Sequence, residues 1–330
     1  MTILVTGGAG YIGSHMVHEL VDASEPVVVL DNLSTGFRFL LPSAVAFVAG
    51  STGDRELVAK TLRHYRVTAI IHFAASIVVP ESVSNPLGYY RNNTMNTCNL
   101  LDVAIETGVK QFIFSSTAAV YGNAEQTPVR EDAATLPISP YGTSKLMSEI
   151  MLHDAGKAHG LRFVVFRYFN VAGADPKLRT GQSTPAATHL IKVACEAALG
   201  KRPRIEVFGT DYPTPDGTCI RDYIHVSDLA RAHSAALAHL RRGGANATFN
   251  CGYGQGSSVF EVIDAVRRAS GRDFPVEISG RRAGDPPALV ANVDRIRATL
   301  DWRPQFQDLD TIVAHALAWE KRLPGKRAPA

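Results

Sequence analysis

The sequence has few cysteines, no long apolar run and almost no excess of either charge. Its four cysteines, Cys98, Cys195, Cys219 and Cys251, are widely spaced, so they form neither a zinc-ligand pattern nor a redox pair, and we expect no metal. No stretch approaches the ~20 consecutive apolar residues that a membrane helix needs. The 34 Lys and Arg residues nearly balance the 31 Asp and Glu residues, for a net charge of +3. Such a balance argues against a nucleic-acid partner.

The composition is that of a globular protein, with 45% hydrophobic and 20% charged residues. At ~150 residues per domain, a chain of this length is expected to form two domains. A strand-like run, Ile3–Val5, follows almost directly after Met1 with no charged segment before it. We therefore expect no signal peptide. Together with the scattered cysteines, this predicts a cytoplasmic protein.

Short apolar runs alternate with longer helix-like segments through the first half of the chain. Continuous apolar runs are typical of parallel strands that are covered on both faces. Strands are predicted at residues 3–5, 27–30, 45–48, 69–73, 112–114 and 163–166, and helices at 12–21, 55–66, 93–107 and 141–158. This repeated order predicts an α/β fold with a doubly wound parallel Rossmann sheet.

The pattern changes after residue 172, where Gly, Pro and Thr become frequent. We expect a Rossmann domain over residues 1–172 and a smaller mixed α/β domain over 173–330. In the second part, helices are predicted at 188–199, 226–241, 258–269 and 308–321, and a strand at 248–251. Part of 222–254 is expected to return to the first sheet.

A glycine-rich loop, Thr6–Gly13, follows the first predicted strand and opens the first predicted helix. Glycines let the backbone turn tightly and approach a pyrophosphate, which the helix N-terminus receives with free N–H groups. The position of the loop between strand and helix makes it a dinucleotide-binding pattern. Asp31 ends the second strand, where a carboxylate binds a ribose 2′-hydroxyl and repels a 2′-phosphate. This favours NAD over NADP, although Arg38 lies close enough in sequence to keep NADP open.

Tyr141 and Lys145 are spaced i and i+4 on one predicted helix, so their side chains face the same way. A phenol has a pKa of ~10, and we expect the neighbouring ammonium to lower it by favouring the phenolate. Such a tyrosine can exchange a proton with a substrate hydroxyl while a hydride goes to NAD. Thr117 ends the fifth strand, at the edge that faces the ligand crevice. Its hydroxyl can orient a sugar hydroxyl, or it can simply cap the strand end.

These motifs resemble those of the extended short-chain dehydrogenase/reductase family over almost the whole chain. Within it, the chain is similar to the epimerases that act on UDP-glucose and UDP-galactose. The stretches that carry the resemblance are 5–15, 30–33, 114–122, 167–170, 208–218 and 221–226. The last two lie outside the general dehydrogenase pattern and are therefore the more specific.

The resemblance implies that the chain interconverts UDP-galactose and UDP-glucose by transient oxidation at sugar carbon 4 with tightly bound NAD. Tyr141 would be the base, with Lys145 and Thr117 beside it. The implied cofactor-binding residues are Gly7, Gly10, Tyr11, Ile12, Asp31, Asn32, Leu33, Ser51, Thr52, Phe73, Ala74, Ala75, Asn92, Ser115, Tyr141, Lys145 and Tyr168. The implied substrate-binding residues are Thr117, Tyr141, Asn170, His189, Leu190, Phe208, Arg221, Arg282, Asp285 and Leu289.

The resemblance also implies that residues 1–172 bind NAD and that 173–330 bind the UDP-sugar. It implies a homodimer, paired through the segments 93–107 and 141–158.

Three alternatives remain at this point. Ala118 and Ala119 follow Thr117 with no ionisable side chain, which argues against a dehydratase that eliminates water. Leu289 occupies the position that limits room for an N-acetyl group in relatives, and it is neither a bulky tyrosine nor a small cysteine. Epimerases of N-acetylated UDP-sugars or of UDP-pentoses therefore stay open. A non-catalytic NAD-binding regulator is the third alternative, but it would need neither Tyr141 nor Lys145.

Overall fold

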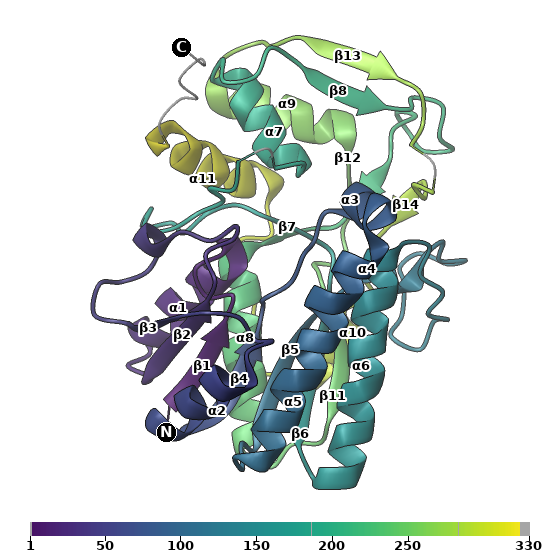
Figure 1. Cartoon of the computed structure of the whole chain (residues 1–330). Helices are drawn as coiled ribbons and strands as arrows, with labels where there is room; N and C mark the ends of the chain where they lie inside the picture. The colour runs from purple at the N-terminus through teal and green to yellow at the C-terminus, as the bar shows by residue number, and fades with distance from the viewer. Residues whose placement is uncertain (1, 186, 283, 324–330) are drawn as a thin grey trace.

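The computed structural model describes residues 2–185, 187–282 and 284–323. Seven parallel strands form its central sheet, in the order β11-β6-β5-β4-β1-β2-β3 (Figure 1). They are β1 (Thr2–Thr6), β2 (Val27–Asp31), β3 (Ala46–Ala49), β4 (Val67–His72), β5 (Gln111–Thr117), β6 (Arg162–Tyr168) and β11 (Ala247–Cys251). All six strands predicted in the first half lie in this sheet, which confirms the doubly wound parallel architecture.

The central sheet is buried on both faces. Side chains of a strand point alternately to opposite faces, so Ile3 and Val5 enter one apolar cluster and Leu4 enters the other. The first face is covered by α1 (Tyr11–Asp22) and α8 (Val226–Arg241), and the second by α2 (Arg55–His64), α5 (Asn96–Glu106) and α6 (Pro140–His159) (Figure 1). Burial on both faces explains why the strands are continuously apolar in sequence.

The helix predicted at 93–107 differs in its first part. The chain is helical from α4 (Pro86–Tyr89), passes through a π-helical turn at Tyr90–Met95, and continues as α5. Within this wide turn, the side-chain Oδ1 of Asn93 accepts from Ser76 N at 2.8 Å, and its Nδ2 donates to Ser144 Oγ at 3.0 Å. The helix pattern did not reveal the turn because a π-turn adds a residue and breaks the 3.6-residue period.

After residue 172 the chain forms small sheets that the sequence patterns did not predict. The pairs are β7 (Asn170–Ala172) with β10 (Tyr223–His225), and β8 (Ile205–Phe208) with β13 (Val276–Ser279); β9 (Ile220–Arg221) lies between β12 (Ser257–Ser258) and β14 (Ala288–Leu289). Helices α7 (Leu190–Ala198), α9 (Val259–Ser270) and α11 (Leu309–Arg322) pack together beyond one end of the central sheet, near the short α3 (Val79–Ser84), whereas α10 (Asp294–Thr299) contacts β11 (Figure 1).

Residues 226–251 lie on the first sheet. Helix α8 packs against α1, β5 and β6, and β11 pairs parallel to β6 with Cys251 opposite Tyr168. One apolar cluster extends from Ile3 in the sheet to Val262 in α9 and to Trp302. The two parts of the chain thus share a core, and the division into domains at residue 172 stays a prediction.

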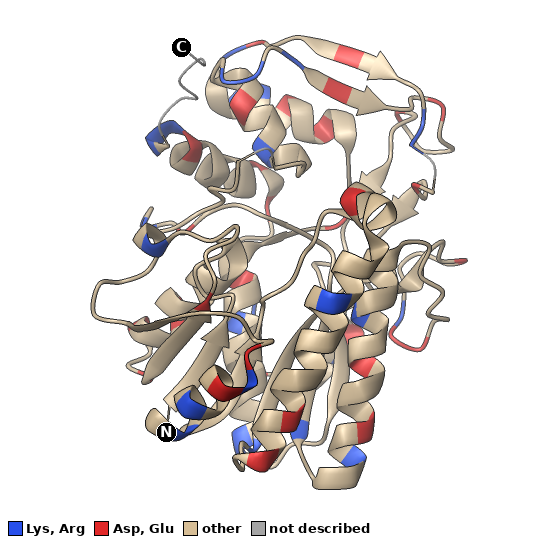
Figure 2. Cartoon of the chain, viewed as in Figure 1, with Lys and Arg blue, Asp and Glu red and all other residues tan. Residues whose placement is uncertain are grey.

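Both basic and acidic residues lie along α2 and α6 in the colouring of Figure 2, whereas α5 carries acidic residues alone. Within the described ranges, no helix is both long enough and apolar enough to cross a membrane.

Candidate active site

The carboxyl ends of the parallel strands meet at one edge of the central sheet. The glycine loop follows β1, Asp31 ends β2, and Phe73 follows β4. In open α/β sheets, ligands bind at this edge where the strand order reverses, here between β1 and β4. The predicted cofactor residues at or directly after these strand ends are Gly7, Gly10, Tyr11, Ile12, Asp31, Asn32, Leu33, Ser51, Thr52, Phe73, Ala74, Ala75, Ser115 and Tyr168.

The glycine loop is packed so tightly that side chains are excluded from it. Gly7 has a φ of +68°, and a Cβ there would lie 2.5 Å from the backbone nitrogen of Ala74. A Cβ on Gly13 would lie 2.2 Å from the Gly7 carbonyl oxygen. Helix α1 begins after Gly10 without a side-chain cap. The N–H groups of its first turn can therefore receive an anion such as a pyrophosphate.

The Asp31 carboxylate connects the glycine loop to the loop after β2, and it can still accept a hydrogen bond from a ligand. Its Oδ2 accepts from Ala9 N at 2.9 Å and its Oδ1 from Leu33 N at 2.8 Å. Burial raises the pKa of Asp31, and these two hydrogen bonds oppose the shift. Each oxygen retains a lone pair for a ribose hydroxyl. Arg38 donates instead to the carbonyls of Pro42 and Val45, so the site fits NAD better than NADP.

Tyr141 and Lys145 lie one turn apart on α6, which begins with the cap that Ser139 forms to Gly142 N. The Lys145 ammonium donates to the Ser115 carbonyl oxygen at 2.8 Å. Burial lowers the pKa of Lys145 to about 7, with Glu149 acting in the opposite direction. The structure thus brings Tyr141, Lys145 and the end of β5 together.

The prediction that Lys145 lowers the pKa of the Tyr141 phenol is wrong for the chain without bound cofactor. Burial raises the pKa of Tyr141, and a hydrogen bond with Thr117 opposes that rise. The amine makes its hydrogen bond to Ser115. Desolvation disfavours the charged form of both groups, which the spacing of two residues on a helix could not reveal.

Two buried hydroxyls at this edge lack a hydrogen-bond partner among the described residues. Ser115 Oγ and the Tyr168 hydroxyl make no hydrogen bond of normal geometry to any described residue. Buried polar groups are rarely left without a hydrogen-bond partner. Asn92, in the π-helical turn, donates to Ser76 Oγ at 2.9 Å and thereby ties that turn to the segment after β4. These features fit a dinucleotide laid along the sheet edge.

Five of the predicted substrate-binding residues form one cluster: Phe208, Arg221, Arg282, Asp285 and Leu289. Arg221 Nη2 lies 3.2 Å from Asp285 Oδ1, and Leu289 on β14 is the register partner of Arg221 on β9. The Arg282 guanidinium lies 3.7 Å over the Phe208 ring. Asp285 N donates to the Arg282 carbonyl at 3.3 Å, which connects the two contacts.

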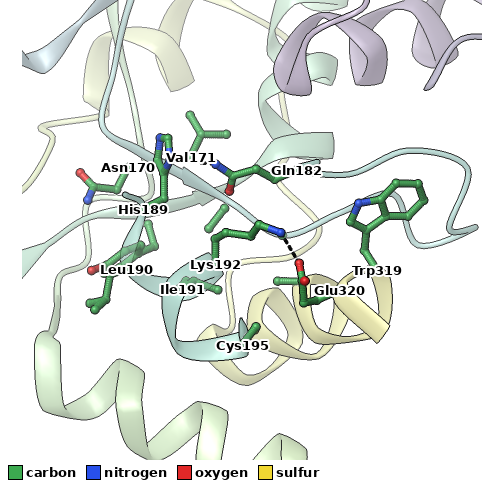
Figure 3. A pocket seen from close by; sticks show the side chains of 14 residues that line it. Asn170, Val171, Gln182, His189, Leu190, Ile191, Lys192, Cys195, Trp319 and Glu320 are labelled. Carbon is green, nitrogen blue, oxygen red and sulfur yellow. Dashed lines mark hydrogen bonds and ion pairs between the residues drawn. The ribbon is translucent and has the colours of Figure 1, made fainter. Parts of the chain in front are cut away.

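A small pocket collects the other three predicted residues, Asn170, His189 and Leu190 (Figure 3). The buried ion pair of Lys192 and Glu320 borders it (Figure 3). Neither Tyr141 nor Thr117 lines this pocket. The pocket is therefore separate from the residues predicted to react.

Sequence reasoning missed a buried ion pair beneath the site. Arg167 Nη2 lies 2.6 Å from Glu149 Oε2, and both side chains are nearly inaccessible. Glu149 follows Lys145 by four residues on α6, so the i, i+4 spacing could have marked Glu149 as a neighbour of Lys145. Arg167 lies in an apolar strand, and no local pattern marked it.

Comparisons with known proteins agree with this geometry. The NAD dependent epimerase/dehydratase family matches residues 3–252. A UDP-glucose 4-epimerase of Azospirillum brasilense is 61% identical, over 97% of this chain and 92% of its own length.

Two solved structures are similar over almost the whole chain. The UDP-glucose 4-epimerase of Brucella ovis in complex with NAD has a TM-score of 0.94 and 46% identity, covering 96% of this chain and 97% of its own. The UDP-Glc/GlcNAc 4-epimerase of Campylobacter jejuni has a TM-score of 0.86 and 48% identity, covering 98% and 99%. On this evidence, the chain belongs to the NAD dependent epimerase/dehydratase family.

Proposed function

We propose that this chain interconverts UDP-galactose and UDP-glucose at carbon 4 of the sugar. The observation that carries the proposal is that Tyr141 and the buried Lys145 of α6 lie at the end of β5, where Thr117 is, on the same sheet edge as the glycine loop. Relatives named UDP-glucose 4-epimerase at 61% and 47% identity support this choice of substrate. An NAD-binding regulator would not need the tyrosine and the lysine, so the chemistry favours an enzyme.

NAD would lie along the carboxyl edge of the sheet. The backbone of Gly7–Ile12 would hold its pyrophosphate, and Asp31 would hold the adenosine ribose. Asn92, Ser115 and Lys145 would line the other end. Bound there, NAD would supply the acceptor, and then the donor, of a hydride for carbon 4 of the sugar.

Tyr141, as the phenolate, would remove the proton of the 4-hydroxyl, becoming a neutral phenol, and would later give that proton back. Thr117 Oγ1 accepts from Ala119 N at 3.1 Å, and its hydroxyl would donate to the same sugar hydroxyl. The Lys145 ammonium would stabilise the phenolate form in which Tyr141 accepts the proton, because a nearby opposite charge favours the ionised form.

The nucleotide must stay fixed while the sugar turns over between the two hydride transfers. Arg221 and Arg282 would bind the diphosphate, because a guanidinium can donate to two oxygens at once. Asp285 would hold the first of them in place. Phe208 and the pocket residues Asn170, His189 and Leu190 would hold the uridine, with Leu289 beside the sugar.

The test is to mix the purified chain with UDP-galactose, without added NAD, and to follow UDP-glucose by proton NMR. We expect conversion towards an equilibrium that is the same from either side, together with the absorbance of protein-bound NAD. UDP-N-acetylgalactosamine and UDP-xylose, supplied in parallel, measure how broad the specificity is. Bound NAD without conversion of UDP-galactose would contradict the proposal.

We also propose that the chain forms a homodimer in the cytoplasm. The apolar side chains of Met95, Met147 and Ile150 are exposed on the π-helical turn and on α6, which pack against each other. The four cysteines are free thiols, which suits a reducing compartment. Sedimentation of the wild type and of the Met147→Lys/Ile150→Lys double variant tests the dimer. A wild-type monomer would contradict it.

A further inference from the structure

A buried polar cluster lies directly behind the catalytic strand and helix. Glu149 of α6 accepts a hydrogen bond from Ser116 Oγ of β5. It also accepts from Arg167 of β6, at 3.1 Å from Nε and 2.6 Å from Nη2. One carboxylate thus joins three neighbouring elements, and none of its partners belongs to the ligand-binding residues proposed above.

The cluster continues from Arg167 towards the far edge of the sheet. Its Nη1 donates to the Tyr121 hydroxyl at 3.1 Å and to the Glu131 carbonyl at 3.2 Å. Tyr121 in turn donates to Asn250 Oδ1 at 2.6 Å. Arg167 is therefore held by Tyr121 and the Glu131 carbonyl as well as by Glu149, and this fixes the position of the Glu149 carboxylate.

The positions of these residues relate them to the proposed chemistry. Glu149 follows Lys145 by one helical turn and Tyr141 by two. Ser116 lies between Ser115, whose carbonyl binds the Lys145 ammonium, and Thr117 at the end of β5. The hydrogen bond from Ser116 to Glu149 therefore fixes α6 against the same part of β5 that meets the proposed catalytic groups.

We infer that Glu149 is a positioning residue, whose buried charge keeps the Lys145 amine in its ammonium form and whose bonds hold α6 against β5. The effect of Glu149 on turnover rests on the proposed function. Its effects on Lys145 and on the packing of α6 against β5 do not. Glu149 is the charge that opposes the effect of burial on the pKa of Lys145. Burial holds that pKa at about 7, so the ammonium population at neutral pH is sensitive to this carboxylate.

Other titratable groups around Lys145 do not supply the same charge. From β4, His72 is neutral because burial lowers its pKa to about 3. From β6, Tyr168 has its pKa raised by burial and stays a neutral phenol. Arg167 carries the opposite sign and is bonded to Glu149. On α6 itself, burial raises the pKa of Tyr141 in the chain without cofactor, so its phenol adds no negative charge there.

The test compares the Glu149→Gln variant with the wild type as NAD-loaded enzymes. The NMR signal of the ¹³C-labelled Lys145 ε-carbon, assigned with a Lys145→Met variant, reports the midpoint of its titration. We expect that midpoint to fall by about one pH unit, as for removal of a nearby buried charge. The alkaline limb of kcat against pH should shift by the same amount, with KM for UDP-galactose changed less than twofold.

The matched control is Glu131→Gln. Glu131 belongs to the same cluster, where its Oε1 accepts from Asn250 N at 2.9 Å, but it lies outside α6. We expect this control to leave the Lys145 midpoint unchanged. Equal midpoints in the wild type and Glu149→Gln, or equal shifts in both variants, would overturn the inference.

A second variant covers the case in which Glu149→Gln does not fold. Glu149→Asp keeps the charge but withdraws it by one methylene, so the midpoint should fall by a smaller amount in the same direction. An unchanged midpoint there would count against the inference. Absence of turnover in the wild type would instead contradict the proposed function, and the titration would still decide the role of Glu149.

Discussion

The two sides of the active site are built in different ways. On the cofactor side, Asp31 and Lys145 are buried and bonded to backbone atoms of neighbouring strands or loops. On the substrate side, Phe208, Arg221 and Leu289 come from short strands in two- and three-stranded sheets. There, the Asp285 side chain is 38% exposed.

This difference predicts how each side responds to substitution. A parallel sheet places the cofactor residues as a consequence of its own packing, so changes there disturb fold and chemistry together. The substrate side depends on contacts between half-exposed groups, which contribute little to stability. Changes there are expected to alter binding and leave the fold intact.

The largest effect is expected for Tyr141→Phe, which separates chemistry from structure on the cofactor side. Loss of the phenol oxygen removes the proposed base, so kcat should fall at least about a thousandfold, within the range of general acid–base catalysis. Bound NAD, measured by absorbance after denaturation, should be retained. Ser144→Ala, on the same helix turn, is the control for local packing. Turnover near the wild-type rate in Tyr141→Phe would remove this residue from its proposed role.

Gly13→Ala tests whether the glycine loop is held by the packing of the sheet. The added Cβ would lie 2.2 Å from the Gly7 carbonyl oxygen, and backbone atoms cannot move aside cheaply. We expect a loss of ~1–3 kcal/mol in the free energy of unfolding, together with loss of bound NAD. Gly280→Ala is the control, because a Cβ at Gly280 meets nothing within 4 Å. Equal urea midpoints for the two variants would refute the argument from packing.

The sequence was informative where the determinants are local. The strands could be predicted because burial on both faces makes them continuously apolar, and the glycine loop and the Tyr141–Lys145 pair are patterns within a few residues. Asp31 could be placed because it ends a strand next to that loop. These features cover the central sheet and most of the cofactor side.

The remainder depends on contacts between distant parts of the chain. Arg221 meets Asp285 across 64 residues, and Arg167 meets Glu149 across 18. No periodicity joins such partners, so the substrate side came only from the family resemblance and the buried ion pair was missed. The pKa of Tyr141 was misjudged for the same reason, since its desolvation depends on elements packed around it.

A smaller effect is expected for the stability of the cofactor side against pH. The folded pKa of Lys145, about 7, lies below its ordinary value of 10.5. Between these values the unfolded chain binds more protons, so this residue makes the free energy of unfolding rise by up to ~1.4 kcal/mol per pH unit. Lys145→Met should remove that contribution in urea unfolding at pH 7, 8 and 9. Lys157→Met, an exposed position on the same helix, should leave the slope unchanged.

The smallest effect is expected for Arg282→Ala on the substrate side. Its guanidinium lies over the Phe208 ring, where it would bind a phosphate oxygen of the nucleotide. Loss of one such partly exposed contact should raise KM for UDP-galactose about fivefold, near ~1 kcal/mol. Because the ring of Phe208 and the backbone of this segment stay in place, kcat and the unfolding midpoint should remain close to wild type.

The neighbouring Arg281 provides the matched control, because it bonds to Asp211 and lies over the Tyr212 ring at 4.3 Å. Arg281→Ala removes an arginine of similar exposure without touching Phe208, so KM should stay within twofold of the wild type. A large fall in stability for Arg282→Ala would show that the substrate side is as firmly built into the fold as the sheet edge. An equal rise in KM for both variants would mean that the general positive charge of this segment binds the nucleotide, rather than the placement of Arg282 over the ring.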